Sequence, residues 1–164
     1  MLYNVKLRLK TPVVGNTWDD SRKLFAFPRE DGAWCLDTGT RHIWIGALFN
    51  AMESLGSASD PDTVRWPRTL LLPSLHLLEI HPPPGRKMRP VRHESIPRNV
   101  ILTIPVMLRK TDGENILNYP REEELHEIFK FIGTYEGISP FGSSAGYGLF
   151  TVQSIAKCES ILGN

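Results

Sequence analysis

Residues 3–10 alternate strictly between apolar and polar side chains, and no other stretch of the chain constrains the fold as strongly. The apolar positions are Tyr3, Val5, Leu7 and Leu9, and the polar positions are Asn4, Lys6, Arg8 and Lys10. Successive side chains of a β-strand point to opposite faces, so the pattern predicts a strand with one buried and one wet face. The wet face carries three cations.

Two other segments show the apolar spacing of helices. Between Thr40 and Leu55 apolar residues recur at helical spacing, Thr40 is a suitable capping residue, and Gly56 suits a left-handed stop. Near residue 120, a proline and three acidic residues precede a second apolar stripe, as is favoured at a helix N-terminus. That stripe consists of Leu125, Ile128, Phe129 and Ile132, and the helix is expected to end near Gly133.

Three further segments are predicted strands. An apolar run over 70–80 is broken by Pro73, which favours an edge strand or a bulge. The run over 99–108 also carries one proline, and 147–155 reads as a last strand. The expected order is therefore strand, helix, strand, strand, helix, strand. This is the α+β, ferredoxin-like (RRM-like) βαββαβ arrangement, an antiparallel sheet with two helices on one face and the other face open.

The length of 164 residues fits one domain, 1–164. We expect elaborated loops at 15–39, where a small hairpin fits, and at 57–68, and a basic connection at 81–98. The N-terminus lacks the apolar run of a signal peptide, and no stretch approaches the length of a membrane span. These features predict a cytoplasmic protein with no membrane association.

Cysteine and histidine spacing indicates no metal or cofactor. Cys35 and Cys158 lie far apart without a CxxC pattern, and the five histidines are scattered. No hydrolase or paired-carboxylate motif is present. We therefore assign no catalytic residue, although a metal-independent RNA endonuclease that uses His42 or His93 as a general base stays open.

The net charge of +1 conceals an uneven distribution. Residues 81–110 hold seven basic residues and one acidic residue, Glu94, a net charge of +6, so the remainder sums to −5. Prolines disfavour a helix in the 82–93 stretch and its charges disfavour burial. Three interpretations remain: a solvated loop that pairs with the acidic remainder, a basic arm that binds phosphates, or a contact for an acidic protein surface.

Glycines and tryptophans add candidate contacts. Gly142, Gly146 and Gly148 lie in a glycine-rich loop, where their backbone allows close approach to a phosphate or a base. The P-loop and dinucleotide-binding patterns are absent, and a turn-rich connection without a ligand is the alternative. Trp18 and Trp66 lie in predicted loops and are candidates for base stacking, whereas Trp44 lies on the apolar helix face.

The Leu-Arg-Leu-Lys-Thr-Pro first strand, the split βαβ order and the Gly-rich loop before Tyr147-Gly-Leu-Phe-Thr-Val152 together resemble the RAMP superfamily. Those proteins are the crRNA-binding subunits of CRISPR effector complexes. The resemblance spans most of the chain and rests on short motifs. It implies an RNA-recognition-like fold that binds single-stranded nucleic acid, assembles along it, and works in the cytoplasm of a bacterial or archaeal host.

The chain also resembles a group of small phage-encoded proteins. The matching stretches are Lys87-Met-Arg-Pro90, Tyr135-Glu-Gly-Ile138 and Gly146-Tyr-Gly-Leu-Phe150. Pro140-Phe141 stands where that group has Arg-Pro, and Leu149 replaces an arginine. The resemblance implies an origin in a phage or mobile element and an action against host defence, for which a fold shared with crRNA-binding subunits would suit mimicry or capture of a host CRISPR-type complex.

The leading hypothesis is a non-enzymatic protein that binds single-stranded RNA or DNA. The alternative is a protein-interaction module, such as an inhibitor of a host CRISPR-type complex or a phage structural subunit. The predicted nucleic-acid contacts are Lys6, Arg8, Arg86, Lys87, Arg89, Arg92 and Arg98, with Gly142, Gly146 and Gly148.

Overall fold

The computed structural model describes residues 1–30, 33–35, 39–65, 70–71, 75–82, 84–85, 89–108 and 120–158. Within these ranges the chain is α+β, with two α-helices and three sheets. In the part of the chain that is described, no helix is long and apolar enough to cross a membrane. The predicted contacts Arg86 and Lys87, and the stacking candidate Trp66, lie outside the described residues.

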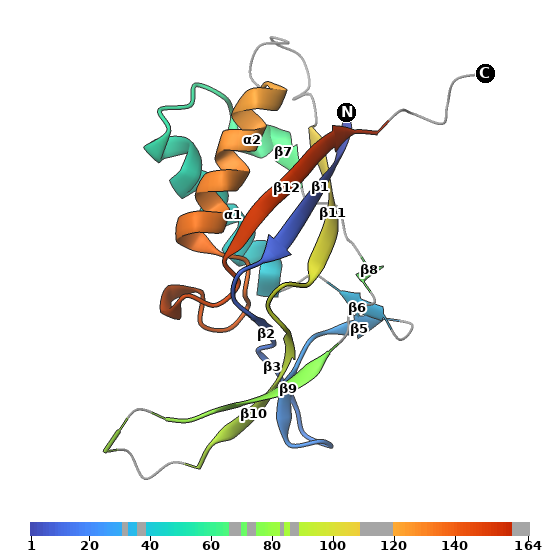
Figure 1. The fold of residues 1–164 in the computed structure, drawn as a ribbon, viewed down its shortest axis with the longest axis vertical. Helices are drawn as coiled ribbons and strands as arrows, with labels where there is room; N and C mark the ends of the chain where they lie inside the picture. The colour runs from blue at the N-terminus through green and yellow to red at the C-terminus, as the bar shows by residue number, and fades with distance from the viewer. Residues whose placement is uncertain are drawn as a thin grey trace, which may run out of the picture.

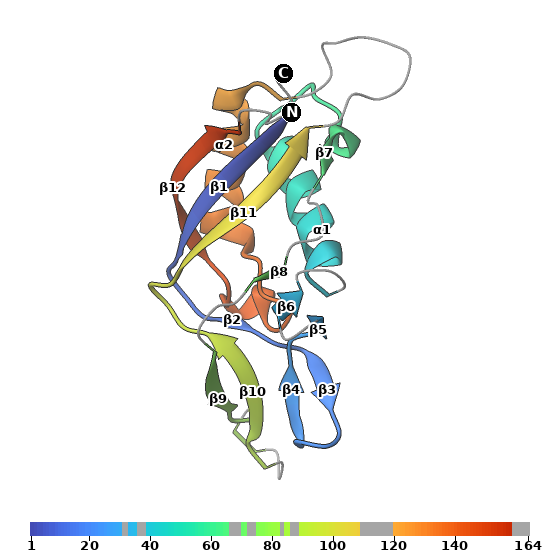
Figure 2. The same cartoon turned by 90° about the vertical axis from the view of Figure 1, so that its right-hand side faces the viewer.

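The central sheet has four strands in the order β12 (Phe150–Lys157), β1 (Leu2–Leu9), β11 (Ile101–Leu108) and β7 (Val64–Arg65). Each neighbouring pair is antiparallel. Helices α1 (Gly39–Ser54) and α2 (Glu122–Phe131) cover one face of this sheet, and its other face is open (Figures 1 and 2).

The alternation of β1 explains why the core lies between sheet and helices. Its odd-numbered side chains from Tyr3 to Leu9 are buried, and β11 buries every second residue from Leu102 to Leu108. The helices add buried residues spaced one helical turn apart: Ala47, Leu48, Ala51 and Met52 from α1, and Leu125, Ile128 and Phe129 from α2. Burial of apolar surface on this scale is the main force that stabilises the fold.

The helices and three strands predicted from periodicity are confirmed, with small shifts at their ends. The predicted helix 40–55 is α1, and Gly56 stops it with φ of 64°. Helix α2 ends earlier than predicted and continues as a π-helical turn, Ile132–Glu136, which ends at Gly137 with φ of 76°. The strands predicted at 3–10, 99–108 and 147–155 are β1, β11 and β12.

The prediction that residues 70–80 form one strand of the central sheet is wrong. Residues in that stretch form two separate strands, β8 (Leu70–Leu71) and β9 (His76–Ile80), in two other sheets. The strand beside β11 is instead β7, preceded by a 3-10 turn at Pro61–Thr63, inside the predicted loop 57–68. A strand of two residues is too short for the alternation that predicts longer strands.

A second, mixed sheet contains β2 (Val13–Val14), β10 (Val91–Ile96), β4 (Leu24–Ala26) and β3 (Thr17–Asp19) in that order. Strand β9 also pairs with β10, from Ile80 opposite Val91 to His76 opposite Ser95. The predicted small hairpin in 15–39 is confirmed as β3–β4. A third sheet contains β5 (Arg29–Glu30), β6 (Ala33–Cys35) and β8. The predicted arrangement, which has a single sheet, therefore lacks the second and third sheets.

The β9–β10 hairpin, which we call the basic arm (residues 76–96), projects from the end of the molecule opposite the start of α2 (Figure 1). The sequence predicted that 81–98 is an open connection between two neighbouring strands. Instead β10 runs through it, with His93, Glu94, Ser95 and Ile96 all buried. Strand β10 pairs with β9, which is close to it in the sequence, and closing the short connection between them has a low entropic cost.

The glycine-rich loop packs against the segment that follows β1. The Gly148 N–H donates to the Pro12 carbonyl (2.8 Å), and the Thr11 hydroxyl donates to the Gly146 carbonyl (2.7 Å). A Cβ atom on Gly148 would lie 2.4 Å from the Ser139 nitrogen, whereas nothing lies within 4 Å of one on Gly146. Both glycines have positive φ, so the two positions differ mainly in the space around them.

We predict that Gly148→Ala lowers the free energy of unfolding by about 3 kcal/mol or more, because a strained φ and a backbone clash add together. Gly146→Ala carries the strain alone and should cost about 1 kcal/mol. Urea denaturation of both variants measures the difference. Equal destabilisation by the two substitutions would contradict this account of the loop.

Candidate nucleic-acid interface

Lys6 and Arg8 lie on the open face of the central sheet. Lys6 stands between Thr103 and Ser154 in the register, and Arg8 stands between Ile101 and Thr151. None of these four neighbours is acidic, and among the described residues no ion pair involves either cation. Both side chains are exposed, so they can bind an anionic ligand without first breaking a salt bridge.

Arg98 is exposed in the turn between β10 and β11. The Asn99 N–H donates to the Leu9 carbonyl (2.8 Å), and the Leu9 N–H donates to the Val100 carbonyl (3.0 Å). These two bonds hold the turn beside the end of β1. The structure therefore brings Lys6 and Arg8 together on one face and places Arg98 in the turn next to the end of their strand.

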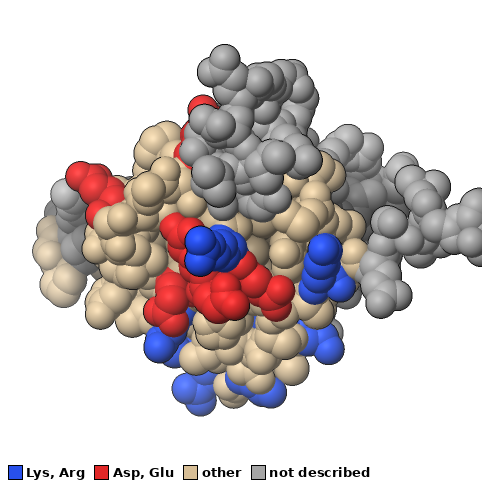
Figure 3. Space-filling model, turned by 90° about the horizontal axis from the view of Figure 1, so that it is seen from above, with Lys and Arg blue, Asp and Glu red and all other residues tan. Residues whose placement is uncertain are grey.

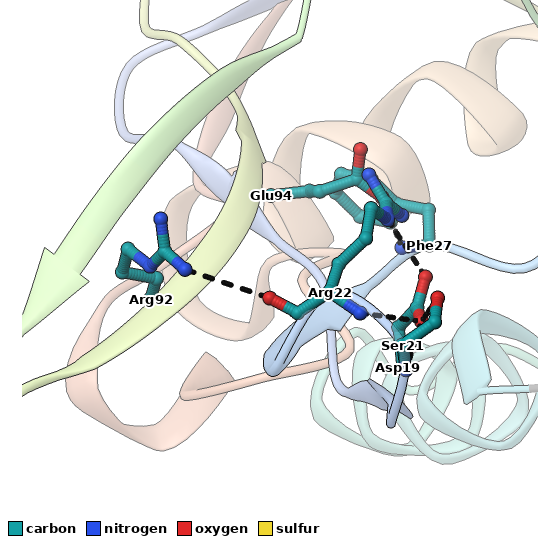
Figure 4. A network of polar contacts seen from close by, with 6 residues as sticks. All are labelled: Asp19, Ser21, Arg22, Phe27, Arg92 and Glu94. Carbon is teal, nitrogen blue, oxygen red and sulfur yellow. Dashed lines mark hydrogen bonds and ion pairs between the residues drawn. The ribbon is translucent and has the colours of Figure 1, made fainter.

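Arg89 and Arg92 lie on the basic arm and are exposed. Arg92 is opposite Glu79 in the β9–β10 register, and its Nη2 donates to the Arg22 carbonyl at 3.5 Å. The arm therefore reaches the turn between β3 and β4, as Figure 4 shows. Arg89 and Arg92 are thus exposed on the arm, with Arg92 beside the β3–β4 turn.

Glu94, the single acidic residue of the basic stretch, is 3% exposed and binds the β3–β4 hairpin to the arm (Figure 4). Its Oε1 accepts from the Phe27 N–H (3.2 Å) and forms an ion pair with Arg22 Nη2 (3.3 Å). In the sequence, Glu94 contributes only to the charge balance of residues 81–110, and its burial is not predicted. The one signal for its burial was the apolar Ile96 that follows it at strand spacing.

Arg22 also pairs with Asp19, with 2.7 Å between Nε and Oδ2. The side-chain hydrogen bond from Arg22, aided by one from Ser21, holds the pKa of Asp19 well below its ordinary value. The hydrogen bond to Asp19 raises the pKa of Arg22 in turn. Both groups therefore stay charged around neutral pH, and they neutralise one another.

The three predicted glycine contacts differ in what their amides already bind. The Gly148 N–H donates to Pro12, and that of Gly146 donates to the Ser143 carbonyl (3.1 Å). Gly142 has a left-handed conformation and precedes a 3-10 turn, Ser143–Ala145. Gly148 is also buried, so its amide serves the fold rather than a ligand.

His93 is 2% exposed, and its Nδ1 lies 2.8 Å from the Gly15 carbonyl oxygen. Its ring stacks on Phe25, with centroids 4.8 Å apart, and it also contacts Phe141. A general base must reach the proton that it removes, and a buried, stacked ring does not. The geometry therefore disfavours the endonuclease hypothesis for His93, and the side chain of His42 lies outside the described set.

The described residues contain no group of three or more His, Cys, Asp or Glu side chains placed to hold a metal ion. The open face of the central sheet presents aliphatic, hydroxyl and cationic side chains at Leu2, Lys6, Arg8, Ile101, Thr103 and Met107. It lacks, in these described positions, the aromatic rings on which RNA-recognition modules stack bases. Trp18 lies elsewhere, on β3, and is 48% exposed.

No family model matches the sequence, and no curated protein matches it. The fold is similar to that of a chain in "Cryo-EM structure of the Type III-B Cmr-beta bound to cognate target RNA", with a TM-score of 0.54 and 14% identity. That match covers 94% of this chain and 59% of the other, so this chain spans less than two thirds of its length. A chain of "Type IV-B CRISPR Complex" is similar with a TM-score of 0.55 and 13% identity, covering 100% and 93%.

These identities show a likeness of fold alone. The structural neighbours are subunits of CRISPR complexes, which agrees with the resemblance to the RAMP superfamily at the level of the fold. The resemblance to small phage-encoded proteins has no support in these comparisons.

We predict that Glu94→Ala lowers the free energy of unfolding by about 2–4 kcal/mol, because it removes a buried carboxylate that pairs with Arg22 and accepts a hydrogen bond from the Phe27 N–H. Glu79→Ala, at an exposed position of the same arm, should change it by less than about 0.5 kcal/mol. Thermal or urea unfolding of both variants provides the measurement. A Glu94→Ala protein as stable as Glu79→Ala would show that the hairpin is held in another way.

Proposed function

We propose that this chain is a non-enzymatic, RNA-binding subunit of a ribonucleoprotein with a ferredoxin-like (RRM-like) fold. It binds the phosphates of single-stranded RNA along a basic path, which we define as Lys6, Arg8, Arg98, Arg92 and Arg89. The observation that carries the proposal is the open sheet face, where Lys6 and Arg8 have neutral cross-strand neighbours.

The order of elements around the central sheet supports the fold assignment. Strands β1, β7, β11 and β12 and helices α1 and α2 follow one another as strand, helix, strand, strand, helix, strand, once the strands of the other two sheets are set aside. Two helices on one face leave the opposite face accessible to a ligand. RNA-recognition modules use the same face, although they rely on aromatic rings that the described positions here lack.

The structural neighbours favour RNA over DNA as the nucleic acid. One of them belongs to a CRISPR complex that is bound to cognate target RNA. A shared fold does not by itself transfer a function, so RNA binding by this chain depends on its own cations. We propose on this basis that the chain joins a CRISPR-type complex.

The uneven distribution of acidic and basic side chains over the surface supports a defined path for the RNA. Asp and Glu side chains gather near the middle of the end at which α2 begins, and most Lys and Arg side chains in this view lie toward its rim (Figure 3). The first turn of α2 supplies three of these acids, Glu122, Glu123 and Glu124. An acidic end repels phosphates, so RNA is expected along the opposite, basic part.

We propose that the RNA approaches the backbone closely at Gly142 and Gly146, but not at Gly148. The two retained glycines lie at the ends of the 3-10 turn and are partly exposed. The basic path carries the phosphate contacts whether or not these glycines contact the strand.

The test is fluorescence anisotropy with a labelled single-stranded RNA at several salt concentrations. We predict that Lys6→Gln combined with Arg8→Gln weakens binding about tenfold or more. Each lost phosphate contact should also reduce the salt dependence, by about 0.7 in the slope of log K against log salt. The matched control is Arg121→Gln with Lys130→Gln, which removes two exposed cations, one just before α2 and one in its last turn, and should leave both quantities unchanged.

Two results would overturn the proposal. One is the absence of RNA binding by the natural sequence at low salt. The other is equal weakening by the test and control pairs, which would indicate a diffuse charge effect. In either case a binding partner captured after nuclease treatment would favour the protein-interaction alternative.

A further inference from the structure

Five aromatic rings contact one another in a row that runs from the edge of the second sheet to the glycine-rich loop. We call this set the aromatic row, and it consists of Trp18, Phe25, His93, Phe141 and Tyr147. Successive ring centroids are 5.1, 4.8, 4.5 and 6.2 Å apart. Aromatic pairs are stabilising at such distances, so the rings support one another.

The strand register explains why three of the rings share one face. Phe25 is opposite Trp18 in the antiparallel β3–β4 pair, and it is also opposite His93 in the parallel β4–β10 pair. The hydrogen bond from His93 Nδ1 to the Gly15 carbonyl holds the His93 ring, which is buried. The inner part of the row is therefore fixed by the backbone of three strands.

Trp18 ends the row at the surface. It lies on β3, an edge strand, and 48% of it is exposed. Its ring and that of Phe25 meet in a T-shaped arrangement, at an interplanar angle of 65°. This contact restricts the indole before any ligand arrives, which lowers the entropic cost of stacking against it.

The β3–β4 turn beside Trp18 holds two acids, and both are paired. Asp19 pairs with Arg22 at 2.7 Å and Asp20 pairs with Lys23 at 2.8 Å, and Arg22 is shared with the buried Glu94. Arg92 from the basic arm donates to the Arg22 carbonyl of the same turn (Figure 4). RNA bound along the arm therefore passes this turn, where the exposed indole offers a flat surface for a base.

We infer that Trp18 is a stacking platform for one unpaired base of single-stranded RNA. The inference rests on the proposed function, because it assigns a base contact to the strand that the basic path binds. Stacking on an indole is tolerant of base identity, since every base has a π-face. Trp18 therefore adds affinity for exposed bases without adding sequence preference.

The test compares Trp18→Ala with the natural sequence on two labelled probes, an oligouridylate and an abasic strand with the same number of phosphates. Trp18→Ala is expected to weaken oligouridylate binding at least about fivefold, with an unchanged salt slope, and to leave abasic binding unchanged. Phe49→Ala, which removes an aromatic ring that is 50% exposed on α1, is the matched control and should bind both probes normally. Trp18→Phe, which keeps a ring, should retain most of the affinity.

Indole fluorescence provides a readout that does not depend on the stability of Trp18→Ala. Oligouridylate should quench the emission of the natural protein, and this quenching should be largely lost in Trp18→Phe. The inference is overturned if salt-dependent RNA binding occurs but Trp18→Ala binds oligouridylate normally, or loses abasic binding equally, or if quenching persists in Trp18→Phe. Absence of RNA binding by the natural protein would instead refute the proposed function itself.

Discussion

The pairing of β1 at the centre of the main sheet is the constraint on which the rest of the structure depends. Its backbone bonds to β11 on one side and to β12 on the other, and its apolar side chains enter the core beneath the two helices. The period of two then leaves Lys6 and Arg8 on the open face. A shift of one residue in this register would place those cations in the core, so the fold and the basic path are specified together.

The second sheet depends on polar burial rather than on alternation. Glu94 and His93 are buried neighbours on β10 whose side chains point to opposite faces. Glu94 binds Arg22 and the Phe27 N–H, whereas His93 joins the aromatic row. One strand thus fixes the β3–β4 hairpin from both sides, with Trp18 on the outer strand of that hairpin.

Periodicity in the sequence was sufficient to predict β1, β11, β12 and both helices, because each is long enough to show its repeat. It was not sufficient for β7, which has two residues, or for β10, in which Arg92 and Glu94 suggested solvent exposure. Burial of Glu94 requires Arg22 and Phe27, which lie about 70 residues away in the chain, so no local pattern reveals it. The alternation also predicted that Lys6 and Arg8 share an exposed face, whereas the pairing of Arg92 with Glu79 and its contact with the β3–β4 turn required the structure.

The most direct test of the central claim is ultraviolet crosslinking of the natural protein to a single-stranded RNA that contains 4-thiouridine, followed by mass spectrometry of the linked peptides. The account predicts crosslinks in the peptides that contain β1, the β3–β4 hairpin and the basic arm, and their loss at high salt. Crosslinks confined to α1 and the acidic start of α2 would contradict it, because RNA would then lie on the face that the cations do not line.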